Sequence, residues 1–168
     1  MTTDKIIWKG VEYSITWKSS KDCSKLDKKK IKQVYAVLFD NSGSICLVRP
    51  TKERGWRLPG GGPELEDKNW KETAIREANE EADIEIKKED LLHLGYIKAI
   101  TLDKKEELYI RCCGKISKIN EQTEDPAEDL INERIFIKPE QFLEYCPWGD
   151  TGKVMIDSAI KIIEKKLK

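Results

Sequence analysis

The sequence predicts an α/β fold in which helices cover both faces of a mixed β-sheet. Three observations favour this class. Apolar segments with the spacing of strands come in pairs joined by short polar turns. Two longer segments, one central and one C-terminal, repeat their apolar residues with helical spacing. No Pro-, Gly- or Ser-rich linker divides the 168 residues, so we expect one domain, with residues 1–33 as an added hairpin and linker and residues 34–168 as its core.

The composition describes a highly charged surface around an ordinary core. Charged residues make up 37% of the chain, and 31 basic residues balance 31 acidic ones. A net charge of zero does not favour nucleic acid as a partner. No apolar run approaches the roughly 18 residues that a membrane helix needs. Because the N-terminus also lacks the apolar stretch of a signal peptide, we expect a cytoplasmic protein without a membrane partner.

Cysteine and histidine usage narrows the classes further. Five cysteines without a CxxC pair indicate reduced thiols rather than a disulfide framework or a zinc ribbon. The single histidine, His93, lies in the apolar stretch LLHLGY, where packing is the usual role. Since a serine or cysteine triad would need that histidine, the sequence disfavours a triad hydrolase.

The first predicted element is a hairpin over residues 6–17 with its turn at Gly10. Apolar and polar side chains alternate from Val11 to Trp17, the period of a strand with one exposed face. The apolar face leaves two arrangements open: packing on the chain's own sheet, or exchange or packing across a homodimer. The lysine-rich residues 18–32 are expected to form a solvated connection.

A second hairpin, over residues 34–39 and 45–49, is more continuously apolar and is therefore expected to be central. The loop that follows leads to a predicted helix over residues 70–83. Apolar residues recur there at every fourth position and form the face expected against the sheet: Trp70, Ala74, Ala78 and Ala82. Asp67 or Asn69 is expected to cap the start of this helix.

The second half of the chain repeats these patterns. Further strands are expected over residues 91–100, 107–116 and 134–137. An acidic, Pro-containing loop covers residues 118–129, and a short helix begins at the proline of residues 139–145. An amphipathic helix over residues 153–167 closes the chain, and its terminal lysines suit the negative end of the helix dipole.

The central helix carries an unusual charge pattern. Because successive helical residues rotate by about 100°, Glu77, Glu80 and Glu81 fall within one sector of the helix surface. Like charges so close repel one another, whereas a hard divalent cation such as Mg²⁺ or Mn²⁺ would bind them. Arg76 lies beside the cluster and could hold one carboxylate in place. The competing interpretation is a solvated face in a chain rich in charge.

Three glycines, Gly60–Gly62, precede this helix. Glycine permits close approach of the backbone, so a carbonyl can reach a metal ion or amides can reach a phosphate. Magnesium ions usually keep several waters and bridge to substrate phosphates. A glycine-rich turn followed by an acidic helix face is thus the arrangement that cleavage of a diphosphate requires.

These residues resemble the Nudix hydrolases, whose box has the form Gly-x5-Glu-x7-Arg-Glu-U-x-Glu-Glu-x-Gly-U, where U is aliphatic. Residues in register with the box are Arg76, Glu77, Ala78, Glu80, Glu81 and Ile84. The stretch WRLPGGG is similar to the family's usual approach to the box. The resemblance covers residues 34–168 and implies a Nudix-like αβα sandwich.

The resemblance also implies a set of site residues. Glu77, Glu80 and Glu81 would be metal ligands, with the carbonyl of Gly61 as an addition, and Arg76 would orient the carboxylates. The general base would come from the box or from the later acidic loop, where Glu124 is our first candidate. The catalytic candidates are therefore Glu77, Arg76 and Glu124.

Two positions depart from the family pattern. The isolated glutamate of the box would fall on Lys68, so its equivalent is Glu64, Glu66 or Asp67 if the loop carries one or two extra residues. The late glycine of the box is Asp83, a change expected to affect how the helix ends.

The expected substrate is a small nucleotide, either a nucleoside triphosphate or an ADP-ribose-like dinucleotide. Arg49, Trp56 and Tyr35 are the candidate substrate-binding residues. Two alternatives stay open: a catalytically silent Nudix-fold module that binds a nucleotide or a protein, and an RNA-binding protein that uses the lysine-rich residues 18–32, which the zero net charge disfavours.

Overall fold

A mixed sheet forms the centre of the computed structural model, which describes residues 2–8, 11–20, 22–101 and 103–166. Its strands are β1 (Thr2–Trp8), β2 (Val11–Ser19), β3 (Ile31–Phe39), β4 (Ile45–Arg49), β5 (Gly60–Gly61), β7 (Leu92–Ile100), β8 (Glu106–Lys115) and β10 (Glu133–Ile137). Within these residues the strand order is β1-β2-β7-β8-β3-β4-β10, and β5 pairs with β3. Strands β3 and β8 run parallel, and the other paired strands of this sheet run antiparallel.

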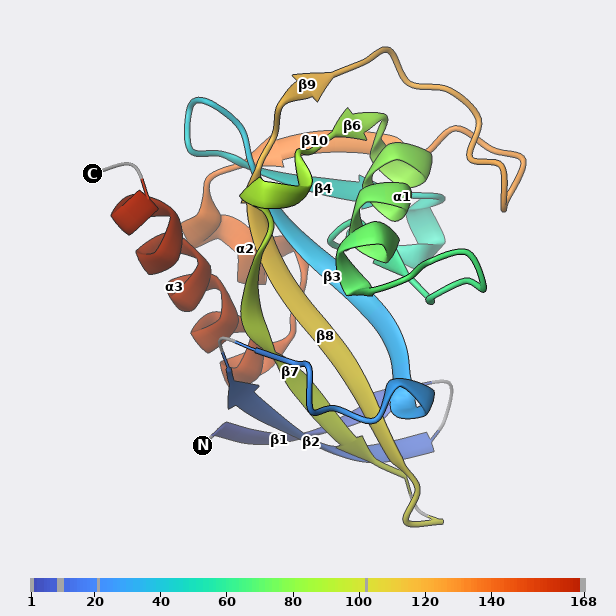
Figure 1. The fold of residues 1–168 in the computed structure, drawn as a ribbon, viewed down its shortest axis with the longest axis vertical. Coiled ribbons are helices and arrows are strands. Elements are labelled where there is room, and N and C mark those ends of the chain that lie inside the picture. Colours follow the sequence, from blue (N-terminus) through green and yellow to red (C-terminus); the bar gives the residue numbers. More distant parts are fainter. Residues whose placement is uncertain (1, 9–10, 21, 102, 167–168) are drawn as a thin grey trace.

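Helices cover the sheet on both sides. Helix α1 (Trp70–Ala82) lies on one face, and α2 (Phe142–Tyr145) and α3 (Gly149–Lys166) lie on the other (Figure 1). Alternate residues of β3 serve the two layers. Val34, Ala36 and Leu38 pack with the alanines of α1, whereas Val37 and Phe39 pack with the apolar face of α3. The continuous apolar run of β3 is thus buried on both faces, and the predicted α/β class with helices on both faces is confirmed.

Short elements complete the chain. Strand β6 (Ile84–Glu85) pairs with β9 (Lys118–Ile119) in a small second sheet. Single 3-10 turns are η1 (Lys28–Lys30), η2 (Lys52–Arg54), η3 (Lys88–Asp90) and η4 (Pro139–Gln141). Of the helices in the described ranges, none has the length and apolar character needed to cross a membrane.

The N-terminal hairpin belongs to the chain's own sheet. Strand β2 pairs with β7, with Trp17 opposite Ile97, so the first of the two arrangements left open by the sequence is observed. The Asp4 carboxylate of β1 accepts a hydrogen bond from the Thr151 amide at 2.9 Å. This contact caps the start of α3, where the helix dipole favours an acidic group. The predicted turn at Gly10 and the side chain of Val11 lie outside what the structure describes.

Strand and helix bounds differ from prediction mainly where partners are distant in sequence. Lys18 extends β2 and Ile31 begins β3, so the solvated connection is shorter than residues 18–32. Their backbones are held by β7 and β8, which a polar local sequence does not reveal. Helix α3 starts at Gly149 rather than at residue 153 because Asp4 of β1 caps it.

Candidate active site

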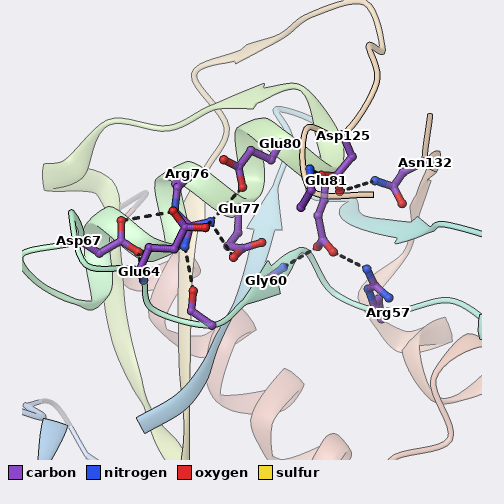
Figure 2. Close-up of polar contacts among 12 residues, drawn as sticks. Arg57, Gly60, Glu64, Asp67, Arg76, Glu77, Glu80, Glu81, Asp125 and Asn132 are labelled. Carbon is purple, nitrogen blue, oxygen red and sulfur yellow. Dashed lines mark hydrogen bonds and ion pairs between the residues drawn. The ribbon is translucent and has the colours of Figure 1, made fainter. Parts of the chain in front are cut away.

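Helix α1 presents Glu77 and Glu81 to the glycine strand β5, which is paired with β3 (Figure 2). The helix begins at its cap Asn69, whose side chain accepts a hydrogen bond from Lys71 N at 3.0 Å. Glu77 and Glu81, about one helical turn apart, then reach β5. A Cβ atom built on Gly61 would lie 2.4 Å from Glu77 Oε1, so the carboxylate packs directly on the glycine backbone. Any larger residue at position 61 would displace Glu77.

Glu81 is fixed by two donors from the same loop. The amide of Gly60 donates to Glu81 Oε2 at 2.8 Å, and the guanidinium of Arg57 forms an ion pair with Oε1. The side chain of Glu81 is 7% exposed. Burial raises the pKa of Glu81, and Arg57 and the Gly60 amide oppose that rise. Nothing in the local sequence predicts this role of Arg57, because a residue before the glycines gives no sign that it reaches a helix more than 20 positions later.

Arg76 lies between the other carboxylates. Its Nη1 donates to Glu77 Oε1 and to Glu80 Oε2, each at 2.9 Å. Its Nη2 donates to the carbonyl of Gly62 at 2.8 Å and to Asp67 Oδ2 at 2.9 Å. One guanidinium thereby ties the glutamates of the helix to the loop that carries the glycines (Figure 2).

Among the three acids proposed as the first box glutamate, Asp67 makes the closest contact with Arg76. Its carboxylate also accepts from the Glu64 amide at 3.0 Å, and its side chain is 7% exposed. Glu64 lies 3.5 Å from Arg76 Nη1 but is 57% exposed, and Glu66 is exposed. Asp67 was also a candidate helix cap, and the structure assigns that role to Asn69.

Asp83, which replaces the late glycine of the box, ends α1 in the left-handed region with φ of +49°. Glycine is favoured there, and aspartate is one of the few other residues that tolerate it. The carboxylate adds contacts that glycine lacks, because it accepts from Thr123 N at 2.9 Å and from Thr123 Oγ1 at 2.7 Å. The departure therefore anchors the acidic loop to the end of α1.

The acidic loop brings Asp125 toward the site. The side chain of Glu124 is exposed, whereas Asp125 is 3% exposed and its negative charge contributes to the raised pKa of Glu81. Asp125 accepts from the Ala127 amide at 2.9 Å and from Asn132 Nδ2 at 3.2 Å. Glu124 is the first candidate that the sequence offers on this loop, but the structure buries its neighbour Asp125. Pro126 is a local signal at this position, because an Asp-Pro pair favours the start of a turn.

The carboxylates of the site lie close enough to influence one another's pKa values. Burial raises the pKa of Glu77 to about 7, and the neighbouring charges of Glu81 and Glu80 act in the same direction against Arg76. Carboxylate oxygens are the donors that Mg²⁺ and Mn²⁺ prefer, so the residues present fit such an ion chemically. Across the described ranges, no three His, Cys, Asp or Glu side chains converge on one point as they stand, because Arg76 engages Glu77 and Glu80. A bound ion would have to draw these carboxylates from Arg76.

We expect the metal-free protein to lose stability between pH 5 and pH 7 because of Glu77. Its folded-state pKa, about 7, exceeds the ordinary value of 4.5, so the folded chain binds the proton more tightly than the unfolded chain. The unfolding free energy must then fall as pH rises through this window, by about 1–2 kcal/mol. Urea unfolding in EDTA would measure this as the difference between wild type and Glu77→Gln. Burial lowers the pKa of His93, but the pH dependence that His93 adds is the same in both proteins and cancels in the comparison. Parallel curves for the two proteins would contradict the prediction.

The candidate substrate-binding residues separate into two places. The Arg49 guanidinium stacks over the ring of Trp56 at 4.3 Å and pairs with Glu133 at 2.5 Å. Tyr35 instead lines a cavity of about 340 Å³ on the α3 side of the sheet. Its ring packs edge-on against Trp148, with centroids 5.9 Å apart.

Comparison with known proteins supplies the family. A family model described as a NUDIX domain matches residues 29–152. The chain belongs to the Nudix family. The resemblance is thereby confirmed, and with it the enzyme class, hydrolases acting on phosphoanhydride bonds. No match was found among curated proteins.

Solved structures resemble this Nudix chain in fold. A mutant of the Bacillus subtilis pyrophosphohydrolase BsRppH has a TM-score of 0.70 at 17% identity and covers 94% of this chain and 96% of its own. That match extends into the N-terminal hairpin and linker. A Nudix hydrolase from Nitrosomonas europaea has a TM-score of 0.60 at 12% identity, covering 77% and 86%. MutT from Methanosarcina mazei Go1 has a TM-score of 0.52 at 20% identity, covering 78% and 92%.

Proposed function

We propose that this Nudix chain is a divalent-metal-dependent hydrolase that cleaves the pyrophosphate bond of a nucleoside diphosphate linked to another group. Nucleoside triphosphates and ADP-ribose-like dinucleotides are the two substrate classes. The observation that carries the proposal is the pair of buried glutamates, Glu77 and Glu81, held against the glycine strand β5. Two carboxylates kept out of water with raised pKa values are typical of a site that binds a cation.

The residues that would hold Mg²⁺ or Mn²⁺ are Glu77, Glu80 and Glu81, with the carbonyl of Gly61. When bound, such an ion would screen the diphosphate and lower the pKa of a water molecule. The chain itself supplies positioning. Arg57 and the Gly60 amide fix Glu81, and Arg76 holds the other two glutamates at a common distance of 2.9 Å.

The attacking water needs a proton acceptor, which we place on the loop anchored by Asp83. Glu124 follows the anchor residue Thr123 directly and is exposed, so it can turn toward a bound substrate. Asp125 is its rival because it is already buried near Glu81. The alternative acceptor within the box is Glu77, whose pKa of about 7 in the metal-free chain suits proton transfer at neutral pH.

Replacing the loop acids one at a time should identify the acceptor. We expect Glu124→Gln to lower kcat by roughly 100-fold or more while KM stays constant, because general-base catalysis contributes about that much. Glu121→Gln, on the same exposed loop, is the matched control and should keep full activity. If the loss follows Asp125→Asn instead, the assignment to Glu124 is wrong.

A nucleotide panel tests the proposed function as a whole. The purified chain is incubated with nucleoside triphosphates and ADP-ribose, in Mg²⁺, in Mn²⁺ and in EDTA, and the products are separated by chromatography. We expect a nucleoside monophosphate and a second phosphorylated product, formed with metal and not in EDTA.

A cytoplasmic location and a homodimer remain predictions from the sequence.

The silent binding module is the second candidate, because Arg76 engages two of the proposed ligands. Such a module would bind nucleotides in the same panel without releasing products. Turnover that depends on metal would exclude it.

A further inference from the structure

Arg111 is a buried cation in a cavity on the side of the sheet opposite to α1. It lies on β8, between Tyr109 and Cys113, which both face the α3 layer, and only 5% of it is exposed. Its Nη1 donates to the Ile110 carbonyl at 3.1 Å, and its Nε has no hydrogen-bond partner. Burial lowers its pKa to about 10, and the groups that oppose this fall are two tyrosines and a cysteine rather than a carboxylate.

A buried guanidinium without an acidic partner is costly for the folded chain, because desolvation of the charge is not compensated. The guanidinium of Arg76, by contrast, has two acidic partners at 2.9 Å. A ligand that accepts hydrogen bonds from the Arg111 guanidinium would compensate this cost.

The cavity around Arg111 has the size and lining of a small ligand site. Its volume of about 340 Å³ lies at the lower end of the usual range, about 300–1,000 Å³. The Arg111 guanidinium stacks over Tyr35 at 4.7 Å and over Trp148 at 5.3 Å. Half-buried Tyr109 and Gln33 also line the cavity, so aromatic faces surround one fork of N–H donors.

Tyr35 connects this cavity with the glutamate site. On β3 it pairs with Gly60 of β5, and a Cβ atom on Gly60 would lie 2.8 Å from the ring atom Cδ1 of Tyr35. The amide of that same glycine donates to Glu81 at 2.8 Å. A nucleotide whose diphosphate lies at Glu81 therefore has an aromatic cavity adjoining it on the other side of β5.

We propose that the Arg111 cavity binds the base of the nucleotide and selects guanine. Guanine presents two acceptors, O6 and N7, on one edge, and a guanidinium fork matches them with two parallel hydrogen bonds. Adenine places an N6 donor at the O6 position, where a group that only donates cannot bond it. Tyr35, Trp148 and Tyr109 line the cavity and give it aromatic walls that suit a flat base. The inference rests on the proposed function, because that function brings a nucleotide to the neighbouring site.

Equilibrium binding of monophosphates tests the inference without hydrolysis, since they contain no phosphoanhydride bond. GMP, AMP, 7-deaza-GMP and inorganic phosphate are titrated in EDTA while the fluorescence of the tryptophans, including Trp148 in the cavity, is recorded. We expect GMP to bind roughly 10-fold tighter than AMP or 7-deaza-GMP. Phosphate binding as tight as that of GMP would show an anion site and overturn the assignment to a base.

Variants of Arg111 complete the test. Arg111→Met should bring GMP and AMP to equal affinity without loss of thermal stability, because it removes an unpaired buried charge. Arg54→Met makes the same chemical change in an exposed ion pair with Glu128 and should keep the preference. If Arg111→Met does not fold, Arg111→Lys serves instead, since it keeps the charge but loses the fork. If the Arg111 variants still bind GMP more tightly than AMP, the inference is overturned. If the wild-type chain binds GMP but hydrolyses no nucleotide, only the proposed function is overturned.

Discussion

Glu81→Gln should reduce hydrolysis by at least about 100-fold while the chain stays folded. The substitution preserves the shape of a side chain that is 7% exposed and keeps an oxygen for the Gly60 amide. It removes the negative charge that a divalent ion would bind. The variant loses the ion pair with Arg57, but it also removes the cost of burying a charged carboxylate, which is what raises the pKa of Glu81. Because these two effects oppose each other, we expect little change in melting temperature.

The measurement is kcat at saturating Mg²⁺, paired with thermal unfolding of both proteins. Glu72→Gln is the matched control, because Glu72 lies on the same helix but binds Lys88 at 2.7 Å, away from β5. It should retain full activity. A Glu81→Gln protein that melts normally and still hydrolyses the substrate at the wild-type rate would refute the assignment of Glu81 as a metal ligand.

Alanine at Gly60 should reduce stability, whereas alanine at Gly61 should reduce activity. At Gly60, φ is +154°, and a Cβ atom would lie 2.2 Å from the carbonyl oxygen of Val34 and 2.7 Å from Tyr35 Cα. Both obstacles are backbone atoms of β3 that cannot move aside, so we expect a loss of about 3 kcal/mol or more in unfolding free energy.

At Gly61 the obstacle is the Glu77 carboxylate, 2.4–2.7 Å from the Cβ position, which is the far end of a flexible side chain. Gly61→Ala should therefore fold with nearly wild-type stability but displace Glu77, with a loss of activity of about 100-fold. Gly62→Ala is the control, since its nearest contact is the Lys32 carbonyl at 3.4 Å. Urea unfolding and kcat for the three variants check this. Equal stability of the Gly60 and Gly61 variants would show that β5 does not press on β3 as described.

The local patterns of the sequence were sufficient for the central elements. Continuous apolar residues predicted the buried strands, and β4 (Ile45–Arg49) has the predicted bounds. The four-residue spacing from Trp70 to Ala82 predicted α1, and the same periodicity placed Glu77, Glu80 and Glu81 on one flank. These predictions succeed because helix and strand geometry fix which near neighbours share a face.

Tertiary structure alone decided which distant groups complete that flank. Arg57 reaches Glu81, Asp67 rather than Glu66 reaches Arg76, and Asp83 binds the acidic loop at Thr123. Arg111 falls within the strand predicted over residues 107–116, and only the packing of β3, β8 and α3 shows that it is buried without an acidic partner. Sequence spacing determines faces over a few residues, but a contact between segments tens of residues apart depends on how the whole sheet is assembled. Local sequence therefore determines the acidic helix. The arginines that contact it and the cavity around Arg111 are assembled only when the helices pack on the sheet.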